Sequence, residues 1–199
     1  MNDIIAPIFA VYLAELFKMT YIELENNLRF IEPQLTPDNI ITAEADTFFC
    51  FCQLLSTMKQ NYIKGFDGIN SNLNKISKLL IKCDKELVEH FEKNDVHIFH
   101  FAFRWSFCLL LREFPLHLSI NLIDYYLLED VLPNELCTFL IVALLLKFSF
   151  KIKTFSKEQI IIFLQSLPTQ NWGEQDIKLL VSEGFTLRSL FKIEENGNF

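Results

Sequence analysis

The sequence predicts an all-α protein built as an irregular multi-helix bundle. Apolar residues recur with a helical period along nearly the whole chain, and no segment shows the strict apolar–polar alternation of a half-buried strand. Only 5 Gly and 6 Pro interrupt the 199 residues, of which 51% are apolar and 22% are charged. This composition is globular rather than disordered, and the length suits one domain with a substantial core.

The first helix is expected from Asp3 to Phe17, a run that is apolar along most of its length. Pro7 lies near its start, where a missing backbone N–H is tolerated because it has no partner within the helix. A non-helical connector marked by Pro33 and Pro37 is expected to follow.

The second helix is expected to begin at Thr42 and to run to Gln60. Thr is a favoured residue just before a helix, because its hydroxyl accepts a hydrogen bond from a free backbone N–H. Glu44 and Asp46 then stand in the expected first turn, where the positive end of the helix dipole stabilises carboxylates.

Breakers and caps define the rest of the chain. Pro115 and Pro133 each suit the first turn of a helix, and Ser156 with Gln159 forms a capping box. The remaining expected helices are Ile69–Ile81, Lys85–Lys93, Val96–Arg112, Pro115–Leu128, Pro133–Phe150, a helix from Ser156 that ends before Pro168, and Glu174–Leu187 with Gly184 as a candidate break.

Charge and cysteine usage exclude several classes of protein. The net charge of −7 and the dispersed Lys and Arg residues argue against binding to a nucleic-acid backbone. The 5 Cys residues are odd in number and match no disulfide framework, so a reducing, cytoplasmic setting is expected. The most apolar run, Leu136–Leu146, is shorter than the roughly 20 residues of a membrane span, so no transmembrane segment is expected.

Three groups of motifs occur in order along the chain. The strongest combines Phe-Ala-Phe-Arg-Trp at 101–105, Arg-Glu-Phe-Pro at 112–115 and Leu-Ile-Asp at 122–124. The others are Glu-Ala-Asp-Thr-Phe-Phe at 44–49, and Leu-Pro-Thr at 167–169 followed by Asn-Trp-Gly at 171–173. Together they resemble the C-terminal half of the TBC domain, the all-helical module that activates GTP hydrolysis by Rab GTPases.

The resemblance covers residues 1–192, which are expected to form a partial TBC domain, with 193–199 as a short tail. The 167–173 motif is similar to a subgroup associated with Golgi and early secretory Rabs. Ile123 stands where the family usually has Trp, and Phe66-Asp67 stand where the subgroup has Gln-Pro. These departures bear on local packing and on the choice of partner.

The resemblance also implies which residues keep the fold and which meet a partner. Asn2 and Asp3 are expected to contact the Rab, although a carboxylate at a helix start is also stabilised by the helix dipole alone. Arg104 and Arg112 are expected to pair with carboxylates such as Glu113 or Asp124. The full set of structural motif residues is Glu44, Asp46, Arg104, Trp105, Arg112, Glu113, Asp124 and Trp172.

The catalytic residues of the family have no counterpart here. TBC proteins use an Arg within Ile-x-x-Asp-x-x-Arg and a Gln within Tyr-x-Gln-Gly, and neither motif occurs in the 199 residues. Residues 1–9 are similar to the segment that follows the Gln motif. We therefore assign no catalytic residue and expect a GTPase activator rather than an enzyme, with these residues alone catalytically incompetent.

Other chemistry is weaker. His97 and His100 are three residues apart on one expected helix, with His90 nearby, but no ligand set for zinc is complete, so no metal or other cofactor is expected. No motif places a base beside Cys50, Cys52 or Cys108, which are interpreted as structural thiols. Arg29 and Arg188 lie in no motif and are expected on the solvated surface.

Three hypotheses follow. In the first, the chain is the C-terminal part of a Rab-activating protein of vesicle trafficking whose reading frame begins upstream. In the second, it is a non-catalytic TBC-like module that binds a small GTPase or another protein. The third is an unrelated helical protein that shares the bundle. For the first two, the protein is expected in the cytoplasm, held at the periphery of Golgi or vesicle membranes through the Rab.

Overall fold

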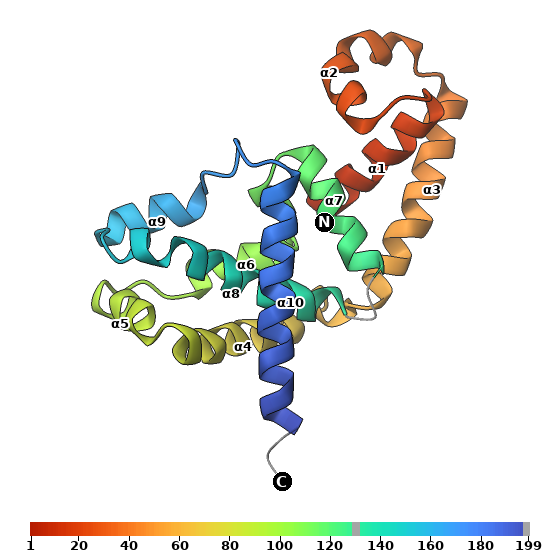
Figure 1. The fold of residues 1–199 in the computed structure, drawn as a ribbon. Helices are drawn as coiled ribbons and strands as arrows, with labels where there is room; N and C mark the ends of the chain where they lie inside the picture. The colour runs from red at the N-terminus through yellow and green to blue at the C-terminus, as the bar shows by residue number, and fades with distance from the viewer. Residues whose placement is uncertain (129–131, 197–199) are drawn as a thin grey trace.

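The computed structural model describes residues 1–128 and 132–196 (Figure 1). Within these two ranges the secondary structure is entirely helical, which confirms the predicted all-α class. The elements in chain order are α1 (Asn2–Leu16), α2 (Tyr21–Ile31), η1 (Glu32–Gln34), α3 (Pro37–Ser56), η2 (Lys59–Asn61), α4 (Asp67–Cys83), α5 (Lys85–Lys93), α6 (Phe99–Phe107), η3 (Leu111–Glu113), α7 (Leu116–Leu128), α8 (Pro133–Ile152), α9 (Lys157–Gln165) and α10 (Glu174–Asn196).

Helix α8 is the centre of the main core. Its buried residues lie on every side of the helix, including Leu140, Ile141, Val142 and Leu144 in succession. A helix that is apolar all round must be covered all round, and α8 is contacted by α4, α6, α7 and α10. The sequence interpretation of 136–146 as a buried core helix is therefore confirmed.

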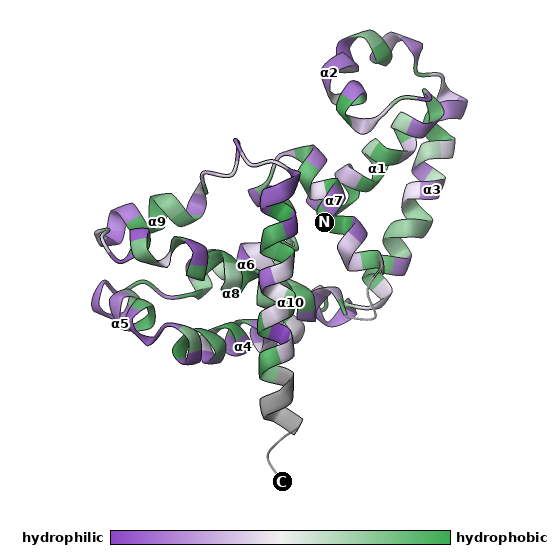
Figure 2. Ribbon diagram, viewed as in Figure 1, coloured by the Kyte–Doolittle hydropathy of each residue, from purple (hydrophilic) through white to green (hydrophobic). Residues whose placement is uncertain are grey.

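Helices α1, α2 and α3 form an arm that projects from this body (Figure 1). The apolar residues of α1 form a nearly continuous run (Figure 2), and α1 packs along α3. A second hydrophobic cluster, separate from the main core, fills the arm with residues such as Leu13, Leu24 and Ala43. Ile120 of α7 belongs to the same cluster, so α7 joins the arm to the body.

The connector expected after the first helix is wrong, because it contains α2. Thr20 and Glu23 cap this helix reciprocally: the Thr20 backbone N–H donates to the Glu23 carboxylate at 2.7 Å, and the Glu23 N–H donates to the Thr20 hydroxyl at 3.2 Å. A Thr-x-x-Glu capping box was thus present in the sequence. Pro33 and Pro37, which marked the expected connector, both lie beyond the end of α2.

The expected start of the second helix at Thr42 is also wrong. Helix α3 begins at Pro37, and its cap is Thr36, whose hydroxyl accepts from the Asn39 N–H at 3.2 Å. Thr42 lies inside the helix and donates to the Asp38 carbonyl at 2.9 Å. Glu44 and Asp46 therefore lie beyond the first turn, so the helix dipole does not explain them.

The expected helix Val96–Arg112 is shorter and is followed by a sharp turn. Helix α6 ends at Phe107, and Leu109 and Leu110 adopt left-handed φ angles of 52° and 62° before η3. This conformation is costly for a side chain with a Cβ. Both leucines are fully buried, so tertiary packing holds a turn that the local sequence does not favour.

Helix α10 runs through Gly184 and past the expected end at Leu187 to Asn196, so the candidate break is wrong. A Cβ at Gly184 would lie 2.7 Å from Leu140 Cδ2, which shows that this glycine permits close packing of α10 on α8. Of the expected tail 193–199, residues 193–196 belong to α10 and residues 197–199 lie outside the described residues. The helix 85–93 and the Ser156–Gln159 capping box are confirmed.

Candidate functional site

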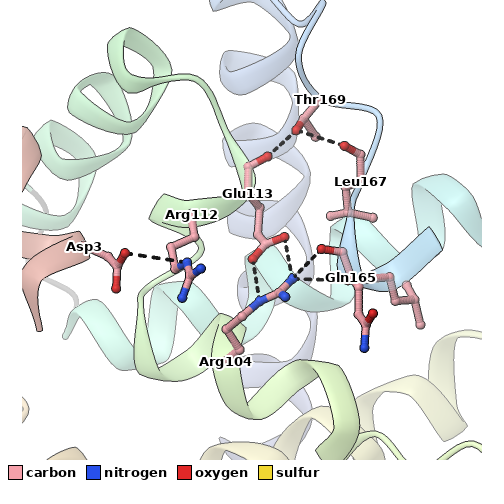
Figure 3. A network of polar contacts seen from close by, with 8 residues as sticks. Asp3, Arg104, Arg112, Glu113, Gln165, Leu167 and Thr169 are labelled. Atoms are coloured by element: carbon pink, nitrogen blue, oxygen red, sulfur yellow. Dashed lines mark hydrogen bonds and ion pairs between the residues drawn. The ribbon is translucent and has the colours of Figure 1, made fainter. Parts of the chain in front are cut away.

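The N-terminal end of α1 meets η3 (Figure 3). The Asp3 Oδ1 atom lies 3.6 Å from Arg112 Nε, and its Oδ2 lies 3.8 Å from Cys108 Sγ. The left-handed turn at Leu109 and Leu110 directs Arg112 toward Asp3, although 109 positions separate them in the chain. Asp3 is half-buried, while Asn2 beside it is exposed.

The thiol of Cys108 is not activated at this place. Burial raises the pKa of Cys108, the Asp3 carboxylate raises it further, and Arg112 offsets only part of the effect. A thiol with a raised pKa remains protonated near neutral pH and is a poor nucleophile. This supports the interpretation of Cys108 as a structural thiol.

Arg104 and Glu113 form a two-pronged ion pair beside this site (Figure 3). Arg104 donates from Nε and from one terminal nitrogen to the two oxygens of Glu113, both at 3.0 Å. The same terminal nitrogen donates to the carbonyl of Gln165 at 3.1 Å. The predicted pairing of Arg104 with a motif carboxylate is therefore confirmed, and it links α6 and η3 to the end of α9.

Glu113 occupies a nearly closed environment, with 4% of its side chain exposed. Burial raises the pKa of Glu113, and the Arg104 guanidinium opposes that rise. The Glu113 carbonyl accepts a hydrogen bond from the Thr169 hydroxyl, which anchors the 167–173 segment (Figure 3). Two of the three sequence motifs thus meet at one residue.

The two motif tryptophans have packing roles. Trp105 is fully buried, with its ring centroid 4.9 Å from that of Phe101. Trp172 is half-buried at 5.5 Å from the Phe114 ring, and the Lys147 ammonium lies 5.1 Å from its centroid. Together they join α6, α8 and the segment before α10.

The other motif residues do not reach this cluster. Glu44 and Asp46 lie exposed on α3. Asp124 on α7 is exposed as a residue, but partial burial of its carboxyl group raises the pKa of that group. Arg112 pairs with a carboxylate as expected, but that carboxylate is Asp3 rather than Glu113 or Asp124. The expectation for Arg188 is wrong, since Arg188 Nε donates to Glu135 at 3.0 Å and both side chains are mostly buried.

A hollow that the sequence did not suggest lies between α1 and α3. Its volume is about 330 Å³, and it is lined by Ile5, Phe9, Glu44, Thr47, Phe48 and Phe51. Phe48, a lining residue from the 44–49 motif, is exposed. The hollow opens on the same two helices that carry Asp3 and the 44–49 motif.

Two features of the described ranges concern metal ligands and membrane-spanning helices. No group of three or more His, Cys, Asp or Glu residues converges as metal ligands in the described part of the chain. The His97 and His100 rings lie 5.6 Å apart, with His97 before the start of α6 and His100 within it. Among 1–128 and 132–196, no helix is both long and apolar enough to span a bilayer.

Comparison with known proteins identifies the family. The Rab-GTPase-TBC domain model matches residues 1–153. GTPase-activating protein gyp1 of Schizosaccharomyces pombe is 33% identical over 192 residues, which cover 96% of this chain and 36% of that protein. Human TBC1 domain family member 22B is also 33% identical over 192 residues, covering 96% of this chain and 37% of that protein.

A solved structure supports the same assignment. The crystal structure of the Ypt/Rab-GAP domain of Gyp1p superposes with a TM-score of 0.85 at 35% identity, covering 96% of this chain and 59% of that one. The chain thus spans little more than a third of the two relatives and under two thirds of the solved domain. Sequence motifs, helix order and superposition agree, and the chain belongs to the Rab-GTPase-TBC domain family.

Proposed function

We propose that this chain is the scaffold-bearing portion of a TBC-type Rab GTPase activator that acts in vesicle trafficking. The observation that carries the proposal is the superposition of 96% of the chain on the Gyp1p Ypt/Rab-GAP domain. The proposed partner is a small GTPase of the Rab family. The proposed location is the cytoplasm, at the periphery of Golgi or vesicle membranes that carry the Rab.

The proposed contact with the GTPase is the surface where α1 begins. Asn2 is exposed there, and Asp3 is held by Arg112 in a defined orientation. The hollow between α1 and α3 adds apolar area, with Phe48 at its rim. A polar pair beside an apolar hollow suits a protein partner, because apolar contact supplies affinity and polar groups fix orientation.

We further propose that the 199 residues alone do not accelerate GTP hydrolysis. Activation needs an Arg that neutralises charge on the transferring phosphoryl group, an effect worth about 10³–10⁵ in rate. The chain has four arginines, and Arg104, Arg112 and Arg188 are each held in an ion pair. Arg29 lies exposed on α2, and α2 is at the far end of the arm (Figure 1).

A single-turnover hydrolysis assay with a panel of GTP-loaded Rabs tests the catalytic part. We expect the hydrolysis rate with the chain to equal the intrinsic rate. Fusion of a segment that carries the Arg motif and Tyr-x-Gln-Gly to the N-terminus of the 199 residues is expected to confer acceleration. Acceleration by the 199 residues, lost in Arg29→Ala, would overturn the proposed incompetence.

A binding assay separates the GTPase partner from the alternative, a non-catalytic module for another protein. One observation favours this alternative: Arg104, Arg112 and Arg188 are each held in an ion pair with a carboxylate of the chain itself. We expect a GTP-loaded Rab to bind the chain, and Asn2→Ala with Asp3→Ala to weaken it about tenfold, while the exposed control Asp38→Ala leaves it unchanged. Absence of binding to every Rab in the panel would favour the alternative.

A further inference from the structure

We propose that the C-terminal end of α8 is a contact site for an anionic lipid bilayer. Phe150 lies there with 88% of its side chain exposed, more than any other large hydrophobic side chain of the described residues. Lys147 and Lys151 flank it on the same helix and are also exposed. This site is remote from the proposed GTPase contact and does not depend on the proposed function.

The sequence around Phe150 differs in charge from the rest of the chain. Residues 147–157, Lys-Phe-Ser-Phe-Lys-Ile-Lys-Thr-Phe-Ser-Lys, contain four Lys and three Phe but no Asp or Glu. The whole chain has a net charge of −7. Lysines beside aromatic residues are the pattern of peripheral membrane contacts, in which cations attract anionic headgroups and apolar side chains enter the interface.

Two of these lysines form ion pairs with carboxylates, and the other two contact aromatic rings. Lys153 Nζ lies 2.7 Å from Asp84 Oδ1, and Lys157 Nζ lies 2.7 Å from Asp95 Oδ2. Lys147 and Lys151 instead have their ammonium groups over aromatic rings, at 5.1 Å from the Trp172 centroid and 5.0 Å from the Phe163 centroid. A ring contact orients an ammonium group without cancelling its charge, so these two lysines can attract anionic lipid.

The shape of the surface favours a bilayer over an acidic peptide. Phe150 protrudes, and a bilayer can accept a protruding aromatic side chain without a complementary pocket. The adjacent hollow between α8 and α10, about 420 Å³ in volume, is where a peptide would lie. Glu183 lines that hollow beside Lys147, so an acidic peptide would meet a like charge.

The position of the site is compatible with a partner bound elsewhere. In Figure 1 the C-terminal end of α8 lies beside α9, on the side of the molecule away from the α1–α3 arm. Two lysines and one Phe give weak attachment, below the partition constant of about 10⁴ M⁻¹ of a single myristoyl chain. The contact therefore serves as a second attachment for a protein that another interaction brings to the membrane.

Vesicle flotation without any GTPase tests the proposal. We expect the chain to float with phosphatidylcholine vesicles that contain about 30% phosphatidylserine, to float poorly with pure phosphatidylcholine, and to be released by added salt. Phe150→Ser is expected to lower the bound fraction about tenfold, because an aromatic side chain no longer enters the interface. Phe150→Trp is expected to retain binding.

Matched variants show whether the position matters rather than the chemistry. Phe49→Ser removes another highly exposed Phe, on α3, and should leave flotation unchanged. Lys147→Gln with Lys151→Gln should abolish the preference for phosphatidylserine, whereas Lys59→Gln with Lys64→Gln, also exposed, should not. Circular dichroism of each variant verifies that the helices are retained.

Three results would overturn the proposal. The first is that neither the unmodified chain nor Phe150→Trp floats with vesicles. The second is that the chain floats equally well with both vesicle types. The third is that Phe150→Ser and Phe49→Ser lower the floated fraction equally. Binding of a glutamate-rich peptide that depends on Phe150, without flotation, would show a protein contact instead.

Discussion

Single residues in this molecule act mainly through the partners that the fold brings to them. Arg104, Arg112 and Arg188 come from three different elements, and each is matched by one carboxylate: Glu113, Asp3 and Glu135. A buried carboxylate without its cation is costly, because water no longer solvates its charge. This argument applies most strongly to Arg104, whose partner Glu113 has 4% of its side chain exposed, and least to the more exposed pair of Arg112 and Asp3.

Replacement of Arg104 by Met is expected to destabilise the fold by about 2–3 kcal/mol. The loss stays below that for a fully buried pair because 32% of the Arg104 side chain is exposed. Chemical denaturation measures it, with Arg29→Met on the exposed α2 surface as the control. A change below about 0.5 kcal/mol in Arg104→Met would contradict the structural role of the pair.

Asp84 is expected to make stability depend on acid pH. Burial disfavours its charge, but Lys153, the Ser149 hydroxyl and the Leu87 N–H outweigh this and hold the pKa of Asp84 below the ordinary value of 3.8. A lowered carboxyl pKa gives stability that is present above the ordinary value and is lost as the pH falls through the folded-state pKa. The predicted loss therefore begins below about pH 4.

Asp84→Asn tests this assignment. The variant is expected to be about 1–2 kcal/mol less stable than the unmodified chain at neutral pH, and the difference should shrink as the pH falls below about 4. Denaturation curves at several pH values measure it, with the exposed Asp46→Asn as the control. A stability difference between the variant and the unmodified chain that does not change with pH would show that Asp84 acts only as the N-cap of α5, by accepting from the Leu87 N–H.

At the scale of elements, caps and close contacts decide where helices begin and how near they approach. Because Thr36 caps α3, Glu44 and Asp46 lie beyond the first turn, on an exposed surface of the helix. Gly68 lies where α4 passes η2, and a Cβ there would be 2.3 Å from Asn61 Oδ1 and 2.9 Å from the Asn61 backbone nitrogen. Both features are local, and each permits a direct test.

Thr36→Ala is expected to cost about 1 kcal/mol, because the Asn39 N–H loses its acceptor. Thr42→Ala, inside the same helix, is the matched control and should change stability by less than about 0.5 kcal/mol. Thermal or chemical unfolding of the two variants measures both effects. The opposite ranking would restore Thr42 as the helix start.

Gly68→Ala is expected to destabilise the fold by about 2 kcal/mol or more, because the new methyl group collides with backbone that has no room to move. Gly173→Ala is the control, since a Cβ there meets nothing within 4 Å. The control should be neutral or slightly stabilising. Equal unfolding midpoints for the two variants would contradict the close approach of α4 to η2.

At the scale of the whole molecule, the outer part of the arm has its own hydrophobic cluster, while the main core includes residues of α1 and α3, namely Ile4, Ile8, Phe51 and Leu54. Ile120 adds a link from α7, since it packs in the cluster of α1–α3. The Tyr21 hydroxyl adds a polar link by donating to Asn121 at 3.1 Å. The proposed GTPase contact at the start of α1 depends on these links, because α1 belongs to the arm and meets η3 of the body.

Ile120→Ala is expected to cost about 2–4 kcal/mol and to increase amide exchange in α1–α3 more than in α8. Hydrogen exchange followed by mass spectrometry resolves the two regions. The exposed Ile162→Ala on α9 is the control and should alter neither. A uniform increase across arm and body would indicate that they unfold as one unit.

The sequence alone determined the helical class, the family motifs and the Ser156–Gln159 capping box, because these depend on residues close together in the chain. It also indicated the pairing of Arg104 with Glu113, which lie only nine residues apart. The domain boundary at 192 and the partner role of Asn2 and Asp3 stay predictions. The Thr20–Glu23 box of α2 and the Thr36 cap of α3 are also local signals, although the expected connector and the expected helix start at Thr42 are wrong.

Tertiary structure alone decided the pairing of Arg112 with Asp3, the left-handed turn at Leu109 and Leu110, and the hollow between α1 and α3. These features join segments that are distant in the chain or require a backbone conformation of higher local energy. Burial of apolar side chains offsets that energy only once the whole core is assembled. Local propensity therefore could not predict them.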